Sequence, residues 1–307
     1  MIHLVKPLKI TFISISLLLL TACLTNEEIA KNNETAERVK DMSGLISHNL
    51  LTQTDHQLHY VSALPASAIQ QESFPNRKSV VFVHGTPGSW GTFAGYFEDE
   101  ALKKDFHLNS IDRPGWGKSG YPGDHFPVYL SSQSALIAPM LEAIWENNNR
   151  EKIILIGHSL GGSLIPKLAA DYPHFVSGIV ILAGDLDPTL AEARWFNKAL
   201  TWVPNFLLPD WVHNSNDEVI AIKPSLAKLQ NEFAKITMPV IVLQGTHDEL
   251  VRPNSAVKAT SIFKEADLEV VWLEGAGHII NLTHTNDVKR ALYQISKKTE
   301  LNLNKSK

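Results

Sequence analysis

The sequence is poor in cysteine and in clustered positive charge, and both shortages exclude classes of protein. Only one of the 307 residues is a cysteine, Cys23, so neither an internal disulfide nor a site built from several cysteines can form. The 28 lysines and arginines are scattered among 32 acidic residues, and the formal net charge is -4. A nucleic-acid-binding protein concentrates its basic residues on one face, so no nucleic-acid partner is expected.

Long apolar runs and cofactor motifs are also missing. The apolar run from Ile10 to Leu20 is too short for a helix that crosses about 30 Å of hydrocarbon. The sequence has no glycine-rich phosphate loop, no dinucleotide fingerprint and no metal-ligand spacing such as H-x-x-x-H. We therefore expect no cofactor and no bound metal. With 44% hydrophobic residues, the chain has enough apolar material for a large core.

The N-terminal segment has the pattern of a signal peptide. Lys6 and Lys9 precede the apolar run, and the letters LTAC follow it at positions 20–23. This tetrapeptide resembles the lipobox of bacterial lipoproteins, in which the cysteine is acylated and becomes the new N-terminus. An ordinary secretory signal with a chance cysteine is the alternative.

The lipobox resemblance implies a processed, membrane-attached protein. Residues 1–22 would be the signal peptide, and Cys23 would carry the lipid anchor in the bacterial cell envelope. Leu24, rather than an aspartate, follows the cysteine and favours the outer membrane if the source is Gram-negative. Residues 23–43 are polar and mixed in charge, so we expect a tether between the membrane and the domain.

After residue 44, short apolar runs alternate with longer segments of mixed pattern. Several runs are continuous in Val, Ile and Leu, as in strands that are buried on both faces. The first two expected strands form an antiparallel hairpin. The pattern predicts an α/β protein whose mostly parallel central sheet is flanked by helices. The expected strands are 45–54, 57–64, 79–84, 107–112, 152–157, 178–183, 239–244 and 268–273, and the expected helices are 130–148, 160–172, 253–263 and 285–298.

Residues 187–235 break this rhythm because they contain no expected strand. We expect them to form a small helical cap between two segments of one core, residues 44–186 and 236–307. The expected place of the cap is above the carboxyl ends of the strands. An ordinary crossover helix with a long surface loop is the alternative.

The cap segment contains three tryptophans, Trp195, Trp202 and Trp211. Exposure of all three would leave large apolar patches on the surface. We therefore predict that they line or roof an apolar pocket for an acyl chain, with Trp90 as another wall.

The clearest sign of chemistry is a serine between a strand and a helix. The apolar run 153–156 continues into GHSLGG at 157–162, and a helical pattern follows. Such a turn exposes Ser159 at the helix N-terminus in a strained backbone, and its glycines let the helix pack against the strand. The motif resembles the nucleophile elbow of the α/β-hydrolase superfamily, and residues 58–298 resemble that fold.

A serine hydroxyl needs a base and a carboxylate that orients the base. The superfamily resemblance implies that His278, in GAGH after the last expected strand, is the base. It implies Asp248, after strand 239–244, as the acid, and the chain order of serine, acid and base agrees. Asp185 and Asp187, after the preceding strand, remain alternatives for the acid.

Two further motifs resemble superfamily loops. HGTPG at 84–88 is similar to the oxyanion loop, which implies that the N–H groups of Thr86 and Leu160 stabilise negative charge on the attacked carbonyl oxygen. His84 is then a brace for this loop rather than a base. DRPGWGKS at 112–119 resembles another superfamily turn and is expected to hold the neighbouring loop.

These motifs predict a serine hydrolase that cleaves small-molecule carboxylic esters through an acyl-enzyme on Ser159, with no protein partner implied. Thioesterase, C–C hydrolase, haloperoxidase-like and aminopeptidase activities are alternatives within the superfamily. The elbow lacks the GGSWG of prolyl aminopeptidases, and its serine argues against dehalogenases and epoxide hydrolases, which use aspartate. A lipoprotein that only binds is another alternative, but it predicts a damaged triad.

Overall fold

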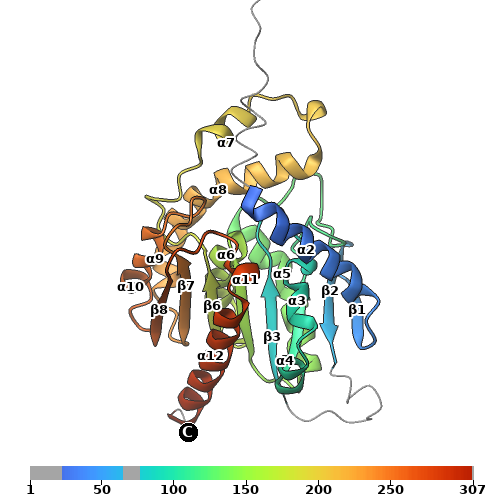
Figure 1. The fold of residues 1–307 in the computed structure, drawn as a ribbon, viewed down its shortest axis with the longest axis vertical. Coiled ribbons are helices and arrows are strands. Elements are labelled where there is room, and N and C mark those ends of the chain that lie inside the picture. Colours follow the sequence, from blue (N-terminus) through green and yellow to red (C-terminus); the bar gives the residue numbers. More distant parts are fainter. Residues whose placement is uncertain (1–22, 65–76, 306–307) are drawn as a thin grey trace, which may run out of the picture.

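The computed structural model describes residues 23–64 and 77–305, in which helices cover both faces of an eight-stranded sheet (Figure 1). The expected signal peptide, residues 1–22, lies outside the described part. The strand order is β1-β2-β4-β3-β5-β6-β7-β8. The strands are β1 (Leu45–Leu51), β2 (Gln57–Ala63), β3 (Lys78–Val83), β4 (Phe106–Ile111), β5 (Ile153–His158), β6 (Val176–Leu182), β7 (Val240–Gly245) and β8 (Leu268–Leu273).

The predicted α/β architecture is confirmed. β1 pairs with β2, and β2 with β4, in antiparallel fashion, whereas every pairing from β4 to β8 is parallel. The parallel strands are rich in Val, Ile and Leu because both of their faces are covered. Alternate residues of β3 show this: Val81 and Val83 belong to one apolar cluster, and Val80 and Phe82 belong to the other.

One face of the sheet is covered by α5, α6 and α8, and the other by α2, α3 and α12. The expected helix 253–263 is divided into two short helices, α9 and α10. The helices are α2 (Cys23–Lys40), α3 (Ala94–Phe97), α4 (Glu100–Asp105), α5 (Leu130–Asn147), α6 (Leu160–Asp171), α7 (Trp195–Leu200), α8 (Asp210–Phe233), α9 (Asn254–Val257), α10 (Ala259–Ile262), α11 (Ile280–Thr283) and α12 (Thr285–Lys305), with 3₁₀ turns η2 (Trp90–Phe93) and η3 (Asn205–Leu207).

The segment expected to be a tether contains helix α2, which packs on the domain beside η2 and α3. Val39 is buried, and Asn32 Nδ2 donates a hydrogen bond of 2.9 Å to the Gly91 carbonyl. Ala36 packs closely against Gly91, where a larger side chain would crowd the helix. The helix docks mainly through polar contacts and small residues, so it lacks the apolar stripe from which a packed helix is predicted. Among the described residues, no helix has the length and hydrophobicity to cross a bilayer.

The segment 187–235 is helical, as expected, and its helices α7 and α8 lie at the end of the molecule above the sheet (Figure 1). It connects β6 to β7, which are neighbours in the sheet. An ordinary crossover of this kind needs one helix, and the C-terminal half of α8 supplies it by packing Leu226 and Phe233 into the core. The remaining residues, from α7 to the start of α8, are free to extend above the strand ends.

Candidate active site

Ser159 lies in the sharp turn between β5 and α6. Its backbone has φ +55° and ψ -122°, a strained conformation for a residue with a side chain. Neighbouring glycines permit the turn, because a Cβ on Gly157 would collide with the Gly161 backbone and one on Gly161 with the Val83 carbonyl. The turn therefore presents the Ser159 hydroxyl at the carboxyl end of the central strand.

Three side chains from separate loops converge at this point. Ser159 Oγ lies 2.9 Å from His278 Nε2, and His278 Nδ1 lies 2.9 Å from Asp248 Oδ2. With the Nδ1 proton donated to the carboxylate, Nε2 is free to accept the serine proton. The structure thus brings the three sequence-predicted residues into one hydrogen-bonded chain, Ser159–His278–Asp248.

The Asp248 carboxylate is held as an anion. Burial alone raises its pKa, but the hydrogen bond from His278 and those from the backbone N–H groups of Val251 and Leu250 outweigh burial, and the pKa lies below its usual value. Both backbone bonds reach Oδ1 at 2.9 Å, and Gln244 Nε2 donates to Oδ2 at 3.1 Å. A carboxylate that is ionised in this way can orient His278 throughout the neutral pH range.

The alternative acids have other contacts. Asp187 Oδ1 accepts hydrogen bonds from the backbone N–H and the hydroxyl of Thr189. Asp185 is buried at the edge of the same pocket, and its Oδ1 has no hydrogen-bond partner among the described residues. Neither carboxylate is the hydrogen-bond partner of His278, a place that Asp248 occupies.

His158, directly before the serine, is a site residue that sequence reasoning missed. Its Nε2 donates a hydrogen bond of 2.9 Å to the backbone carbonyl of His278, and the two imidazole rings lie 4.9 Å apart. Burial, together with the nearby charge of His278, lowers the pKa of His158 to about 3, so its ring is neutral. The sequence feature that could have identified His158 is its position inside the GHSLGG motif, directly before Ser159.

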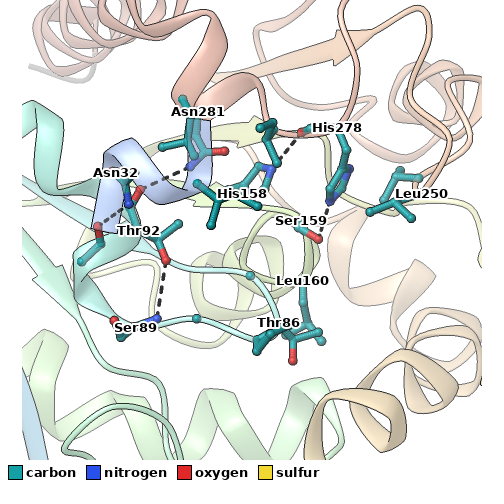
Figure 2. A pocket seen from close by; sticks show the side chains of 18 of the residues that line it. Asn32, Thr86, Ser89, Thr92, His158, Ser159, Leu160, Leu250, His278 and Asn281 are labelled. Atoms are coloured by element: carbon teal, nitrogen blue, oxygen red, sulfur yellow. Dashed lines mark hydrogen bonds between the residues drawn. The ribbon is translucent and has the colours of Figure 1, made fainter. Parts of the chain in front are cut away.

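The loop after β3 faces the nucleophile. A Cβ on Gly85 would approach Ser159 Cβ to 2.9 Å, so the loop backbone lies directly against the serine. Leu160 is the first residue of α6, where an N–H group has no partner within the helix. Thr86 and Leu160 both line the pocket beside Ser159 (Figure 2). Their amides can therefore serve as donors to an oxyanion.

A buried polar network supports this loop from behind. His84 Nδ1 donates to the Gly85 carbonyl at 2.7 Å, and its Nε2 accepts from the Arg113 N–H at 3.0 Å. Burial lowers the pKa of His84 to about 3, which keeps the ring neutral for this arrangement. Arg113 also donates from Nε to the His84 carbonyl and from Nη2 to the Gly85 carbonyl, at 3.0 and 2.8 Å. These contacts give His84 the geometry of a brace.

The same arginine ties the cap to the loop. Arg113 Nη1 lies 2.6 Å from Glu218 Oε1 on helix α8, and both side chains are completely buried. Gln133 Nε2 and Trp116 Nε1 donate to the same carboxylate at 2.7 and 3.2 Å. The buried ion pair therefore connects α8 to the loop after β3.

Replacing Glu218 by alanine should lower the free energy of unfolding by about 3–5 kcal/mol, because Arg113 would stay buried without its counter-ion. Urea unfolding of the variant measures this loss. The matched control is Glu192→Ala, which removes an exposed pair with Lys198 and should leave the free energy of unfolding almost unchanged. Equal losses in the two variants would contradict the role assigned to the buried pair.

A cavity of about 580 Å³ opens beside Ser159 and His278. Helix α2 contributes polar side chains to one side, and Figure 2 shows Asn32 and Asn281 there, with Leu250 on the opposite side of the serine. The cap contributes apolar side chains. The cavity residues from α2 are Ile29, Asn32, Asn33, Ala36, Glu37 and Lys40, and those from α7 and α8 include Phe196, Asn197, Val219 and Ile222.

Three of the four predicted pocket tryptophans lie elsewhere. Trp90 lines the cavity as predicted, but Trp195, Trp202 and Trp211 do not and are more than half exposed on the cap. An apolar contact of the kind expected from these residues comes instead from Phe196, the next residue of α7, whose ring lies 6.1 Å from that of Trp195. Hydrophobicity alone does not indicate which face of a short helix turns inward, and this is why the prediction for the three tryptophans was wrong.

The pKa of Asp185 is raised to about 6 from 3.8, because burial disfavours its charged form more than nearby groups favour it. A folded-state pKa above the unfolded value has no effect on stability below about pH 4, lowers the stability progressively between about pH 4 and 6, and lowers it by the full amount above about pH 6. Asp185→Asn should therefore stabilise the protein by about 2–3 kcal/mol at pH 8 and by little at pH 4. Urea unfolding at both pH values measures this difference, and a gain independent of pH would contradict it.

The comparisons with known proteins agree with the fold. A family model described as the alpha/beta hydrolase family matches residues 80–291, and the chain therefore belongs to this family. Human (Homo sapiens) monoglyceride lipase is 22% identical over 242 residues, which cover 66% of this chain and 76% of the lipase.

Two other relatives have different names. A 2-hydroxy-6-oxononadienedioate/2-hydroxy-6-oxononatrienedioate hydrolase from a Pseudomonas species is 28% identical over 245 residues, covering 67% of this chain and 83% of the relative. The crystal structure of a putative lipase from Acinetobacter baumannii superposes with a TM-score of 0.60 at 20% identity, covering 88% of this chain and 97% of that one. The chain spans between 32% and 54% of the length of several other curated relatives.

Proposed function

We propose that this chain is a serine hydrolase that cleaves carboxylic esters through an acyl-enzyme on Ser159. The observation that carries the proposal is the continuous hydrogen-bonded chain from Ser159 through His278 to Asp248, which opens into a cavity with an apolar side. Monoglyceride lipase and the putative lipase, by their names, act on carboxylic esters, which supports this choice.

The hydrogen bonds of Ser159, His278 and Asp248 support a two-step reaction. His278 Nε2 takes the proton of Ser159 as Oγ attacks the ester carbonyl carbon, and the N–H groups of Thr86 and Leu160 stabilise the oxyanion. His278 then gives that proton to the leaving alcohol oxygen as the C–O bond breaks. In the second half-reaction a water molecule loses a proton to His278 and attacks the acyl carbon. His278 returns that proton to Ser159 Oγ as the bond between Oγ and the acyl carbon breaks, which releases the acid. Asp248 keeps the imidazole oriented in both halves.

A labelling experiment tests this proposal. The purified full chain should react with a fluorophosphonate, and mass spectrometry of the digest should locate the label on Ser159. The same protein should hydrolyse p-nitrophenyl esters faster than matched thioesters and aminoacyl anilides. Labelling at another serine, or a preference for the anilides, would contradict the proposal.

C–C bond hydrolysis is the second candidate. The Pseudomonas relative is named as a hydrolase of 2-hydroxy-6-oxo dienedioates and trienedioates, which are keto acids rather than esters. Thioesterase, haloperoxidase-like, aminopeptidase and purely binding functions have no comparable observation in their favour. A vinylogous 1,5-diketone acid added to the ester panel separates the two candidates. Faster turnover of the diketone than of every ester would favour the second.

We also propose that residues 1–22 are a lipoprotein signal peptide and that Cys23 is acylated, which would attach the hydrolase to a bacterial membrane. The support is the LTAC sequence after a short apolar run. Cys23→Ala should move the protein from the membrane fraction to the soluble fraction, or block its processing. Mass spectrometry of the mature N-terminus gives the direct measurement, and an unmodified Cys23 there would contradict the proposal.

A further inference from the structure

The outer surface of the cap carries large apolar side chains that contact little else. Trp195, Trp202, Phe206, Leu207 and Trp211 are between 55% and 87% exposed, and together we call them the cap patch. They lie on α7, on η3 and at the start of α8, the part of the chain that forms one end of the molecule in Figure 1. Exposed apolar groups gathered on one surface mark an interaction site.

The chemistry of the cap patch suits a lipid interface. From Trp195 to Leu208 the sequence has a single charged residue, Lys198, and no carboxylate. Two of the three cap-patch tryptophans lie in this segment, and Trp211 follows it after Asp210. Tryptophan prefers the boundary between lipid headgroups and acyl chains, where one part of the ring is apolar and the other is wet. A partner protein with a charged surface would find almost nothing to pair with here.

The cap patch is continuous with the entrance of the cavity. Phe196 follows Trp195 on α7, and both Phe196 and the exposed Leu250 line the cavity that contains Ser159. Ile29 of α2, also exposed, lines the same cavity from the other side. The rings of Trp195 and Phe196 lie 6.1 Å apart, so the apolar rim of the cavity adjoins the cap patch.

The N-terminal chain arrives at the same end of the molecule. Helix α2 begins at Cys23, and in Figure 1 its first turns lie beside the cap, whereas its last turns run towards β1 and β2. The 22 residues that precede it, with the apolar run from Ile10 to Leu20, therefore join the domain next to the cap. A membrane that holds this end of the chain would lie against the cap patch.

We propose that the cap patch docks on the surface of a lipid bilayer and that the cavity entrance opens against this surface. The docking goes beyond the proposed hydrolysis, because it does not depend on Ser159. It also adds a second membrane contact to the proposed acylation of Cys23, and stable attachment of lipidated proteins commonly needs two such contacts. An ester held in the bilayer would then reach Ser159 between the cap and α2 without crossing water.

Fluorescence quenching tests the docking. The full chain is purified in detergent and reconstituted into phosphatidylcholine vesicles whose acyl chains carry bromine, which quenches tryptophans at the boundary of the hydrocarbon. We expect strong quenching of the wild-type emission and loss of a large part of the quenched signal in Trp202→Ser. The matched control, Trp272→Phe, removes a tryptophan exposed on edge strand β8 and should leave the quenched signal unchanged.

Several outcomes would overturn the docking. They are no quenching of the wild type, or an equal loss of quenched signal in Trp202→Ser and Trp272→Phe. Sedimentation provides a further test. If the wild type is a dimer, if Trp202→Ser abolishes that dimer and if lipid does not quench the fluorescence, the cap patch binds a second copy of the chain instead of a bilayer. Phe206→Ser keeps every tryptophan and should weaken the lipid quenching of their fluorescence. This variant is a control for the case in which Trp202→Ser fails to fold. None of these readouts uses catalysis, so failure of the proposed hydrolysis would leave them unaffected.

Discussion

Ser159→Ala is expected to lower kcat for ester hydrolysis by about 10⁶-fold, as in other serine hydrolases that lose their nucleophile. The variant cannot form an acyl-enzyme, and His278 then has no hydroxyl to activate. The fold should be retained, because the Ser159 hydroxyl bonds only to His278 among the described residues and its backbone contacts do not need the side chain. Circular dichroism checks the fold, and stopped assays at high enzyme concentration measure the residual rate.

The matched control is Ser163→Ala, one turn further along α6. Ser163 is buried, and its hydroxyl has no hydrogen-bond partner in the described part of the chain, so its loss should change neither activity nor fluorophosphonate labelling. Full labelling of the Ser159→Ala protein by the fluorophosphonate would contradict the assignment of Ser159 as the nucleophile. Loss of activity in both variants would point to damage in α6 instead.

Asp248→Asn is expected to lower kcat by about 10⁴-fold with little change in KM. The amide would donate a hydrogen bond to His278 Nδ1, which places the imidazole proton on Nε2, and that nitrogen then cannot accept the serine proton. The measurement is the rate of hydrolysis of a soluble ester as a function of its concentration, which gives kcat and KM separately. Asp187→Asn is the control, because among the described residues its carboxylate hydrogen-bonds only to Thr189 and should be dispensable. A larger loss in Asp185→Asn than in Asp248→Asn would transfer the acid to the earlier strand.

The parallel strands were the easiest part of the fold to predict. A strand such as β5, buried on both faces, requires a continuous run of Ile and Leu, and few other structures do. The elbow was visible for a similar reason, since Gly157 and Gly161 sit where any side chain would collide with backbone. Strong local constraints leave a pattern in the sequence, and Ser159 and Asp248 each follow such a strand, whereas His278 follows the half-buried edge strand β8.

Helix α2 and the cap surface could not be predicted, for opposite reasons. α2 contacts the domain through Asn32, Val39 and an exposed ion pair between Arg38 and Glu98. Because most of these contacts are polar, the sequence of α2 resembles that of a solvated linker. The cap tryptophans have a strong signal, but apolar character indicates only that a side chain avoids water. The sequence does not say whether Trp202 avoids it inside the protein or, as proposed above, in a lipid surface.

The network around Arg113 joins residues that are far apart in the chain: the oxyanion loop, a side chain of α5 and Glu218 of the cap. A second set of distant contacts lies at the opposite end of the sheet. There Lys78, at the start of β3, donates hydrogen bonds to Ser296 and Thr299 of α12, more than 200 residues later. Contacts of such long sequence separation form late in folding and slowly. Asp248 and His278 follow β7 and β8, so the hydrogen-bonded chain from Ser159 to Asp248 cannot form on a nascent chain until both of these late strands have been synthesised.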